Sequence, residues 1–192
     1  MKKILILSGG YSKEKEISRS SAKSIYKTLK DKYKILVCEP DSEFISKIKK
    51  FKPEVVYNSL HGRFGEDGYI QALLENLKVK YTHSGVNSSS IAMDKEISKR
   101  IFMQNNIRTP KFLKLNNFDL TKNKNALLKN IEIKLGFPVV IKPVDEGSSV
   151  DVNICNKKNI IKNLKKLSSY KEVLVERYIG GREIQVAIMG NK

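Results

Sequence analysis

Pro138-Val-Val-Ile-Lys-Pro-Val-Asp-Glu-Gly-Ser-Ser-Val-Asp-Val152 contains strand and turn signals in close succession. The β-branched run 139–141 predicts a short buried strand. Lys142 stands at the end of that strand, and Pro143, which has no N–H, stops the sheet ladder. Gly147-Ser148-Ser149 predicts a turn before a second β-branched run. The stretch therefore predicts a β-hairpin with a small, hydroxyl-rich tip.

The tip of this hairpin carries groups that suit phosphate oxygens. Successive backbone N–H groups in a turn, two hydroxyls and an ammonium at the base make a concave anion site. The hydroxyls belong to Ser148 and Ser149 and the ammonium to Lys142. Spacing alone does not separate this interpretation from a surface hairpin with one exposed lysine, so both stay open at this point.

The totals limit the class of protein. The 192 residues suit one large domain or two small ones. No apolar run approaches the roughly 20 residues of a membrane span, and Ile4-Leu-Ile-Leu7 is too short for a secretion signal, so we expect a cytoplasmic protein without a membrane segment. Cys38 and Cys155 lie in apolar runs without a metal-binding neighbour, which predicts buried thiols and neither zinc nor a disulfide.

The net charge of +17 raises the possibility of a nucleic-acid partner, because basic proteins attract polyanions. The distribution of the charge argues against it. Lysines are spread over every segment among Asn, Ser and Ile, and no basic stripe of the kind that nucleic-acid-binding proteins present is visible. We therefore predict no nucleic-acid partner.

The first part of the chain alternates strands and helices. Strands are predicted at 3–8, 34–38 and 55–57, and helices after Ser12, which can cap the first of them, and at 43–51. This alternation predicts a parallel sheet with right-handed crossovers. Ligands bind beyond the carboxyl ends of such strands, where the loops 9–16 and 58–68 are expected.

The loop 58–68 concentrates charged residues between glycines. Three glycines in His61-Gly-Arg-Phe-Gly-Glu-Asp-Gly68 predict a compact loop, and Glu66 and Asp67 are expected at the start of the next helix, where the helix dipole favours carboxylates. His61 is a candidate switchable hydrogen-bond donor, and the alternative is a loop histidine without a role in binding.

The rest of the chain mixes helices and strands. We expect a short strand and turn at 81–85, a helical turn at 88–93 and a helix at 96–104, with Thr109-Pro110 ending this pattern. Segment 111–122 is predicted as a loose polar connection. Helices are then expected at 127–135 and 157–167, and strands at 173–179 and 183–189.

Several short motifs together resemble the D-alanine–D-alanine ligase family of the ATP-grasp superfamily. They are Gly9-Gly10 with Glu16-Ile-Ser18, His61 to Gly68, Ser84-Gly85, Met93-Asp-Lys95, Lys142 to Val150, and Glu176 with Gly181-Arg-Glu183. The resemblance implies an α/β protein. An N-terminal parallel-sheet, Rossmann-like domain is expected at 1–95, a small α+β central ATP-grasp domain at 96–180, and the start of a truncated C-terminal ATP-grasp domain at 181–192.

The resemblance also implies a reaction and its partners. One D-alanine carboxylate is phosphorylated by ATP to an acyl phosphate, and the amine of a second D-alanine then attacks it, which gives D-Ala-D-Ala for peptidoglycan, ADP and phosphate. The expected cofactors are ATP and Mg²⁺ (or Mn²⁺). The full-length protein is expected to be a homodimer.

Residue roles follow from the same resemblance. Lys95 and Lys142 match lysines on the ATP phosphates, and the serines of the tip also contact ATP. Glu16 matches the acid that receives the ammonium of the first alanine. His61 and Ser148 match residues that line the same alanine site. The catalytic residues implied are Glu16 and Ser148. The ATP-binding residues implied are Lys95, Lys142, Ser148, Ser149, Glu176, Arg177, Tyr178, Ile179 and Glu183, of which Glu176 to Ile179 read adenine and Glu183 holds the ribose.

Two departures qualify this resemblance. Asp151 stands where glycine is expected, and the chain ends at Lys192, before the part that is expected to hold the metal ligands and the second alanine. We therefore expect no metal ligands in this chain and no ligase activity from it alone. There are two alternatives: a different ATP-grasp carboxylate–amine ligase, and a nucleotide-binding module without catalysis.

Overall fold

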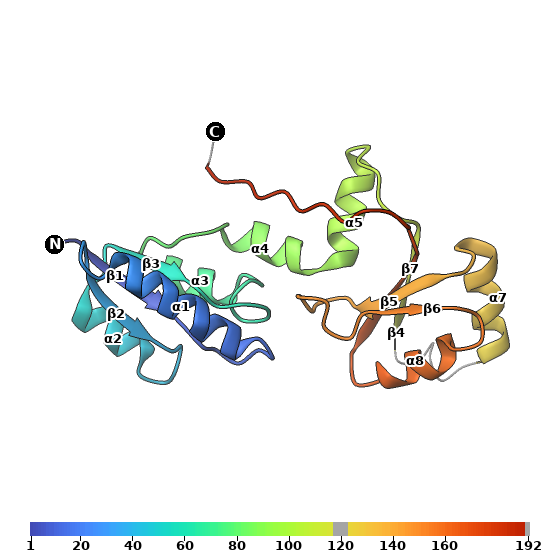
Figure 1. The fold of residues 1–192 in the computed structure, drawn as a ribbon, viewed down its shortest axis with the longest axis horizontal. Coiled ribbons are helices and arrows are strands. Elements are labelled where there is room, and N and C mark those ends of the chain that lie inside the picture. The colour runs from blue at the N-terminus through green and yellow to red at the C-terminus, as the bar shows by residue number, and fades with distance from the viewer. Residues whose placement is uncertain (117–122, 191–192) are drawn as a thin grey trace. The chain divides into compact units, whose positions relative to one another are not determined.

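The structure, a computed structural model, describes residues 1–116 and 123–190 (Figure 1). The chain forms two compact units. Unit 1 comprises Met1–Arg108 and Lys142–Asp151, and unit 2 comprises Thr109–Ile141 and Val152–Lys192. The predicted hairpin at 138–152 therefore contributes to both units, and its tip belongs to unit 1. The domain boundaries predicted from the resemblance, at 95 and 180, are a different division and stay a prediction.

Unit 1 contains the predicted parallel sheet. Its strands are β1 (Lys3–Leu7), β2 (Lys34–Cys38) and β3 (Val55–Asn58), in the order β2-β1-β3. β1 lies in the middle, with Leu5 opposite Leu36 on one side and Val56 on the other. Because the central strand is covered on both faces, its side chains from Leu5 to Leu7 are fully buried. This explains why β1 is an unbroken apolar run.

Helices cover both faces of this sheet (Figure 1). Alternate side chains of a strand point to opposite faces, so Ile4 and Ile6 pack with Ala22 of α1 (Lys15–Leu29). On the other face, Leu5 and Leu7 join a core with side chains of α2 (Phe44–Phe51) and α3 (Tyr69–Asn76). Two further helices, α4 (Val86–Met93) and α5 (Lys95–Gln104), complete unit 1 among the described residues.

Ser12 does not cap α1 in the way that the sequence predicted. The residue at the N-cap position is Glu14, and it makes no side-chain capping bond. The Ser12 hydroxyl instead accepts a hydrogen bond from the Glu14 N–H at 3.1 Å and donates one to the His61 carbonyl oxygen at 2.7 Å. Ser12 therefore ties the loop before α1 to the loop after β3.

Unit 2 is built on a second sheet, with strand order β4-β7-β5-β6. The strands are β4 (Phe112–Asn116), β5 (Val139–Pro143), β6 (Asn153–Cys155) and β7 (Glu172–Arg177). β5 and β6 pair antiparallel, which confirms the predicted hairpin. The helices α7 (Lys124–Lys134) and α8 (Ile160–Lys166) pack on the sheet around a core that includes Ile131 and Ile141.

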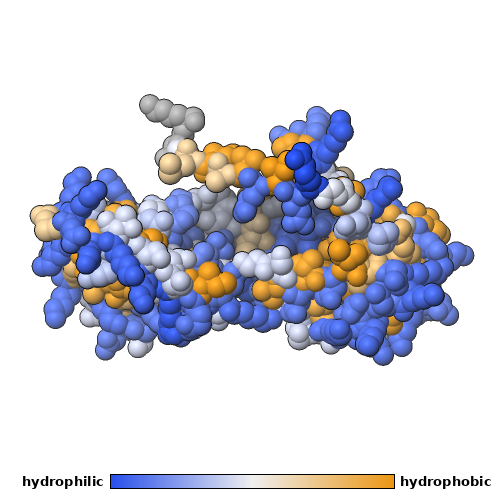
Figure 2. Space-filling view, viewed as in Figure 1, coloured by the Kyte–Doolittle hydropathy of each residue, from blue (hydrophilic) through white to orange (hydrophobic). Residues whose placement is uncertain are grey.

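Two segments differ from the sequence-based predictions. Residues 112–116, predicted as part of a loose connection, form β4, because antiparallel pairing with β7 satisfies their backbone groups. The rest of that predicted connection, 117–122, lies outside the described residues. The predicted strand at 183–189 is wrong, because no ladder pairs with the segment in the part of the chain that is described. Its apolar side chains are exposed, with Ile188 at 91%. Figure 2 shows apolar side chains on the surface of the segment that follows β7.

The two cysteines are buried as predicted. Cys38 belongs to the core of unit 1 and Cys155 to the core of unit 2. Burial raises the pKa of the Cys38 thiol to about 11, so this thiol stays protonated at neutral pH. None of the helices described here is long and apolar enough to cross a membrane.

A matched pair of substitutions on α7 tests the core of unit 2. Ile131 is fully buried, whereas Ile133 on the same helix is 73% exposed. Ile131→Ala should lower the free energy of unfolding by about 2–5 kcal/mol, because it leaves a cavity. Ile133→Ala should change it by less than about 0.5 kcal/mol. Urea unfolding followed by circular dichroism measures both, and equal losses would contradict the burial of Ile131 in the core.

Candidate functional site

The base of the hairpin is held by Lys95. Its backbone N–H donates to the Val144 carbonyl oxygen at 3.1 Å, and its ammonium donates to the same oxygen at 3.2 Å and to the Glu146 carbonyl oxygen. Lys95 is the first residue of α5, whose N-cap Asp94 accepts a hydrogen bond from the Ile97 N–H at 2.9 Å. The start of α5 therefore fixes the position of residues 144–146, which directly follow β5.

Lys142 adds a second positive charge near Lys95. Burial lowers the pKa of Lys95 below its ordinary value, and the positive charge of Lys142 lowers it further. The carboxylates of Asp145, Glu146 and Asp94 act in the opposite direction. An ammonium has three N–H donors, and two carbonyl oxygens accept from Lys95, which leaves capacity for one more acceptor. The pair of ammonium groups suits an anion with several oxygens.

The tip of the hairpin has an unusual backbone. Ser148, Ser149 and Asp151 all have positive φ angles, of 42°, 60° and 55°. Residues with a Cβ atom rarely adopt this left-handed conformation, which costs roughly 1–2 kcal/mol per residue. The Val150 N–H donates to the Gly147 carbonyl oxygen at 2.9 Å and closes a turn. Contacts outside the tip must therefore stabilise its conformation.

One of those contacts is with Glu14. This carboxylate is only 6% exposed, and it accepts a hydrogen bond from the Ser148 hydroxyl. A Cβ atom at Gly62, where φ is +69°, would lie 2.9 Å from Glu14 Oε2, so a larger residue there would displace the carboxylate. Gly147 also lies beside Glu14, with its hypothetical Cβ atom at 3.5 Å from the same oxygen. Two glycines and a serine therefore surround a buried acid.

Glu16, which the resemblance selected, lies elsewhere. Its side chain is 79% exposed and accepts a hydrogen bond from Arg19 at 2.7 Å. Arg19 also contacts Glu39 at 2.6 Å, and Lys15 contacts Glu39 at 3.3 Å, so Glu16 belongs to a network of surface charges. Hydrogen bonding to Arg19 lowers the pKa of Glu39. The structure thus places Glu14, and not Glu16, against Ser148.

Sequence reasoning missed Glu14 because both acids lie near the start of the same helix. α1 begins at Lys15, so Glu14 still belongs to the loop while Glu16 lies in the first turn. The available signal was the position of Glu14 in the loop that follows Gly9-Gly10, next to Ser12. A loop residue can turn toward the ends of the strands, whereas the direction of Glu16 is set by the helix.

The loop 58–68 is compact, as predicted, because its own side chains bind its backbone. The amide groups of Asn58 and Gln71 both donate to the Gly65 carbonyl oxygen at 2.8 Å. Glu66 accepts from the Gly62 N–H at 2.6 Å, and Asp67 accepts from the Tyr69 N–H at the start of α3 at 3.1 Å. These carboxylates organise the loop.

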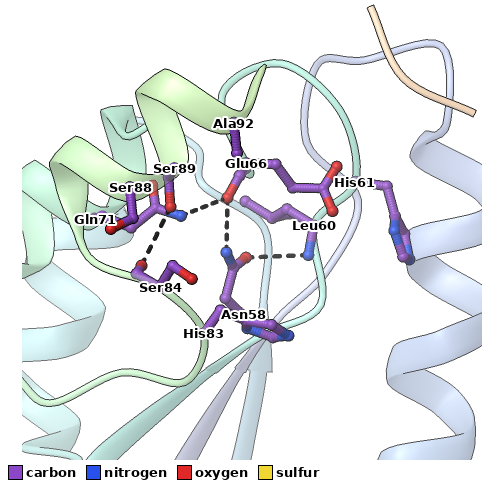
Figure 3. A pocket seen from close by; sticks show the side chains of 11 residues that line it. Asn58, Leu60, His61, Glu66, Gln71, His83, Ser84, Ser88, Ser89 and Ala92 are labelled. Carbon is purple, nitrogen blue, oxygen red and sulfur yellow. Dashed lines mark hydrogen bonds between the residues drawn. The ribbon is translucent and has the colours of Figure 1, made fainter. Parts of the chain in front are cut away.

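His61 lies on the side of this loop that faces α1 (Figure 3). Its Nε2 atom is 3.5 Å from the Ser21 hydroxyl oxygen, and its carbonyl oxygen accepts the bond from Ser12. His61 and Glu14 therefore lie in loops that Ser12 connects. The structure thus links the loop of His61, a predicted site residue, to the loop of Glu14, which the sequence did not predict, and not to Glu16.

A pocket of about 250 Å³ lies behind the same loop (Figure 3). Its lining includes Asn58, Gln71 and Ser89, and the Ser89 hydroxyl donates to the Ser84 carbonyl oxygen at 3.2 Å. The buried Gln71 Oε1 atom has no hydrogen-bond partner among the described residues. A single water molecule would satisfy that oxygen.

The residues expected on adenine and ribose belong to unit 2. Glu176 is buried at the end of β7, opposite Phe112. The N–H groups of the next two residues are used by the sheet: Arg177 donates to Lys111 at 2.9 Å and Tyr178 to Pro138 at 3.2 Å. The groups that this edge can offer a base are therefore carbonyl oxygens and the N–H of Ile179. Glu183 follows in the exposed segment after β7.

Within residues 1–116 and 123–190, no group of three or more His, Cys, Asp and Glu side chains is arranged to hold a metal ion. The donor side chains that the structure describes therefore do not form a fitting set for a divalent cation.

Comparisons with known proteins support one family. The family model described as D-ala D-ala ligase C-terminus matches residues 101–192. The D-alanine–D-alanine ligase of Pelagibacter ubique is 61% identical over 192 residues, which are 100% of this chain and 62% of that protein. The ligase of Wolbachia pipientis wMel is 42% identical over 189 residues, 97% of this chain and 58% of that protein.

Solved structures agree. D-alanine–D-alanine ligase from Bacillus anthracis has a TM-score of 0.81 and 35% identity, over 94% of this chain and 59% of that one. A structure of the same ligase complexed with ATP has a TM-score of 0.78 and 34% identity, over 94% of this chain and 60% of that one. This chain thus spans about three fifths of the length of the relatives it matches.

Proposed function

Because this chain belongs to the D-alanine–D-alanine ligase family, we propose that the protein uses ATP to join two D-alanine molecules for peptidoglycan synthesis. The γ-phosphoryl group passes to the carboxylate of the first D-alanine and leaves ADP. The amine of the second D-alanine then attacks the carbonyl carbon, loses a proton and expels phosphate, which gives the dipeptide. Nothing in this scheme requires a covalent bond to the protein.

The observation that carries the proposal is the position of Ser148. Its hydroxyl contacts the buried Glu14, while the same hairpin is anchored at its base by the Lys95 ammonium beside the charge of Lys142. One short segment therefore connects a buried acid, suited to an ammonium group, with two cations, suited to phosphate. A ligase that phosphorylates an amino acid needs these two kinds of site next to each other.

The ammonium groups of Lys95 and Lys142 would hold the phosphates of ATP. A lysine ammonium is a compact point charge that suits phosphate oxygens, and its partial burial strengthens the attraction. Ser148 and Ser149 add hydroxyl donors at the tip. By the resemblance, the edge Glu176 to Ile179 would hold the base, chiefly through the Arg177 carbonyl oxygen and the Ile179 N–H, and Glu183 would hold the ribose.

Glu14 is our candidate for the acid that binds the ammonium of the first D-alanine, in the role that the sequence assigned to Glu16. A buried carboxylate gives a stronger charge-assisted hydrogen bond than an exposed one that already contacts an arginine. His61 and Ser148 would line the same site. With its ammonium held there, the substrate's carboxylate can be directed toward the lysine pair.

The family also implies Mg²⁺, whose part in phosphoryl transfer is to neutralise charge on the phosphates. The described side chains do not form a fitting donor set, so no step here is assigned to the metal. The homodimer, the cytoplasmic location and the absence of a nucleic-acid partner stay predictions.

Lys142→Ala should weaken ATP binding roughly ten- to a hundredfold, because a hydrogen bond to a charged group contributes about 1.5–3 kcal/mol. Lys142→Arg should restore only part of the affinity, since a planar guanidinium does not replace a point charge. Isothermal titration of ATP into the 192-residue chain measures this, with the exposed Lys27→Ala on α1 as control. Equal affinity in the Lys142→Ala and Lys27→Ala proteins would contradict the phosphate role.

In a full-length ligase that carries this chain, Glu14→Gln should raise the D-alanine concentration needed for half-maximal dipeptide formation by roughly ten- to a hundredfold, through loss of a charge-assisted bond. The dependence on ATP should change little. Glu16→Gln is the matched control, because the same exchange two residues later removes only a surface contact. A larger effect from Glu16→Gln would contradict the role of Glu14 and would assign the binding of the D-alanine ammonium to Glu16.

A further inference from the structure

Three residues of the hairpin, each three positions from the next, contact the loops of unit 1. Asp145 forms an ion pair with Arg63 at 3.3 Å, Ser148 donates to Glu14, and Asp151 forms an ion pair with Lys13 at 3.2 Å. All these residues belong to the same compact unit. The hydrogen bond between Ser148 and Glu14 therefore lies between two ion pairs along the hairpin.

The backbone of Asp151 indicates that its carboxylate has a role. Asp151 has a φ angle of +55°, a conformation that glycine adopts without strain and that other residues rarely adopt. Aspartate tolerates it better than most residues do, but glycine would still fit better. What aspartate adds at this position is a negative charge, and that charge lies against the ammonium of Lys13.

The small stabilisation that exposed ion pairs provide suits a reversible contact. The side chains of Lys13 and Arg63 are 61% and 60% exposed, and those of Asp145 and Asp151 are each 46% exposed. An exposed ion pair shifts an equilibrium by no more than about fivefold. Two such pairs are too weak to determine the fold, yet they suffice to shift a hairpin tip between a docked and an undocked position.

We propose that the pairs Lys13–Asp151 and Arg63–Asp145 form an ionic latch, which docks the hairpin tip on the loops of unit 1 and holds Ser148 against Glu14. Asp145 and Asp151 are then positioning residues that act through Ser148. The docked fraction falls as salt screens the pairs. The latch itself requires no ligand, whereas its effect on D-alanine binding rests on the proposed function.

Amide hydrogen exchange of residues 147–151 in the ligand-free 192-residue chain tests the latch. Lys13→Gln and Asp151→Asn remove one charge each, and asparagine also tolerates a positive φ angle, so the backbone is preserved. Each single variant should exchange two- to fivefold faster, and the double variant no faster than either single one, because both lose the same contact. These variants form one double-mutant cycle, and Arg63→Gln with Asp145→Asn forms a second one.

Salt gives an independent measure. Raising ionic strength from about 0.01 M to about 1 M shortens the screening length from about 30 Å to about 3 Å. Because salt screens both pairs, the unmodified chain at high salt should exchange as fast as the variant that lacks both pairs, and that variant should hardly respond to salt. Lys23→Gln, an exposed lysine on α1, is the control and should keep the exchange rate and the salt response of the unmodified chain.

Additive effects in both cycles, or exchange that is unchanged by all four substitutions, would overturn the latch, whatever the activity of the protein. Coupled effects in a protein that binds neither ATP nor D-alanine would support the latch and contradict only the proposed function. In an active ligase, the latch variants should raise the KM for D-alanine by two- to fivefold. Asp151→Glu, which keeps the negative charge, should raise it less than Asp151→Asn does.

Discussion

The bond between the Lys95 ammonium and the carbonyl oxygens of Val144 and Glu146 is the contact on which the rest of the site depends. Burial of a cation beside a second cation is unfavourable, and it lowers the pKa of Lys95. The two carbonyl oxygens offset part of that cost. Because they belong to the hairpin, the same bonds that stabilise the charge also set the course of residues 144–146. Helix α5, the lysine pair and the hairpin thus form one structural element.

At the hairpin tip, the contact between Ser148 and Glu14 depends on the size of the neighbouring side chains. Gly62 leaves room for the Glu14 carboxylate beside Ser148, because a Cβ atom at position 62 would lie 2.9 Å from Glu14 Oε2. Ser12 connects the loop of Glu14 to that of His61, and the loop 58–68 is held by its own amides and carboxylates. A rigid parallel sheet carries both loops at the ends of β1 and β3. A buried acid and a pair of cations are thereby attached to opposite ends of one short hairpin, an arrangement suited to the phosphorylation of an amino acid.

Sequence patterns predicted the elements that are recognisable from their own residues alone. The apolar run of β1 and the two β-branched runs around the tip appear as strands, because burial of such runs needs only neighbouring strands. Glu14 was not found, since which of two acids is buried depends on whether the residue precedes or follows the first turn of α1. β4 was missed because its stability comes from β7, about sixty residues later in the chain. Residues 183–189 have the pattern of a strand without a pairing partner in the described structure.

Titration of the Lys95 ammonium in the 192-residue chain, with and without ATP, tests most directly whether the lysine pair and the hairpin form a phosphate site. The signal is assigned by its loss in Lys95→Arg. In the free chain the pKa should lie below the value of about 10.4 for an ordinary lysine, because of burial and of the charge of Lys142. Bound ATP should raise it, since phosphate oxygens stabilise the charged form. An ordinary pKa in the free chain, or a pKa that ATP leaves unchanged, would contradict this assignment.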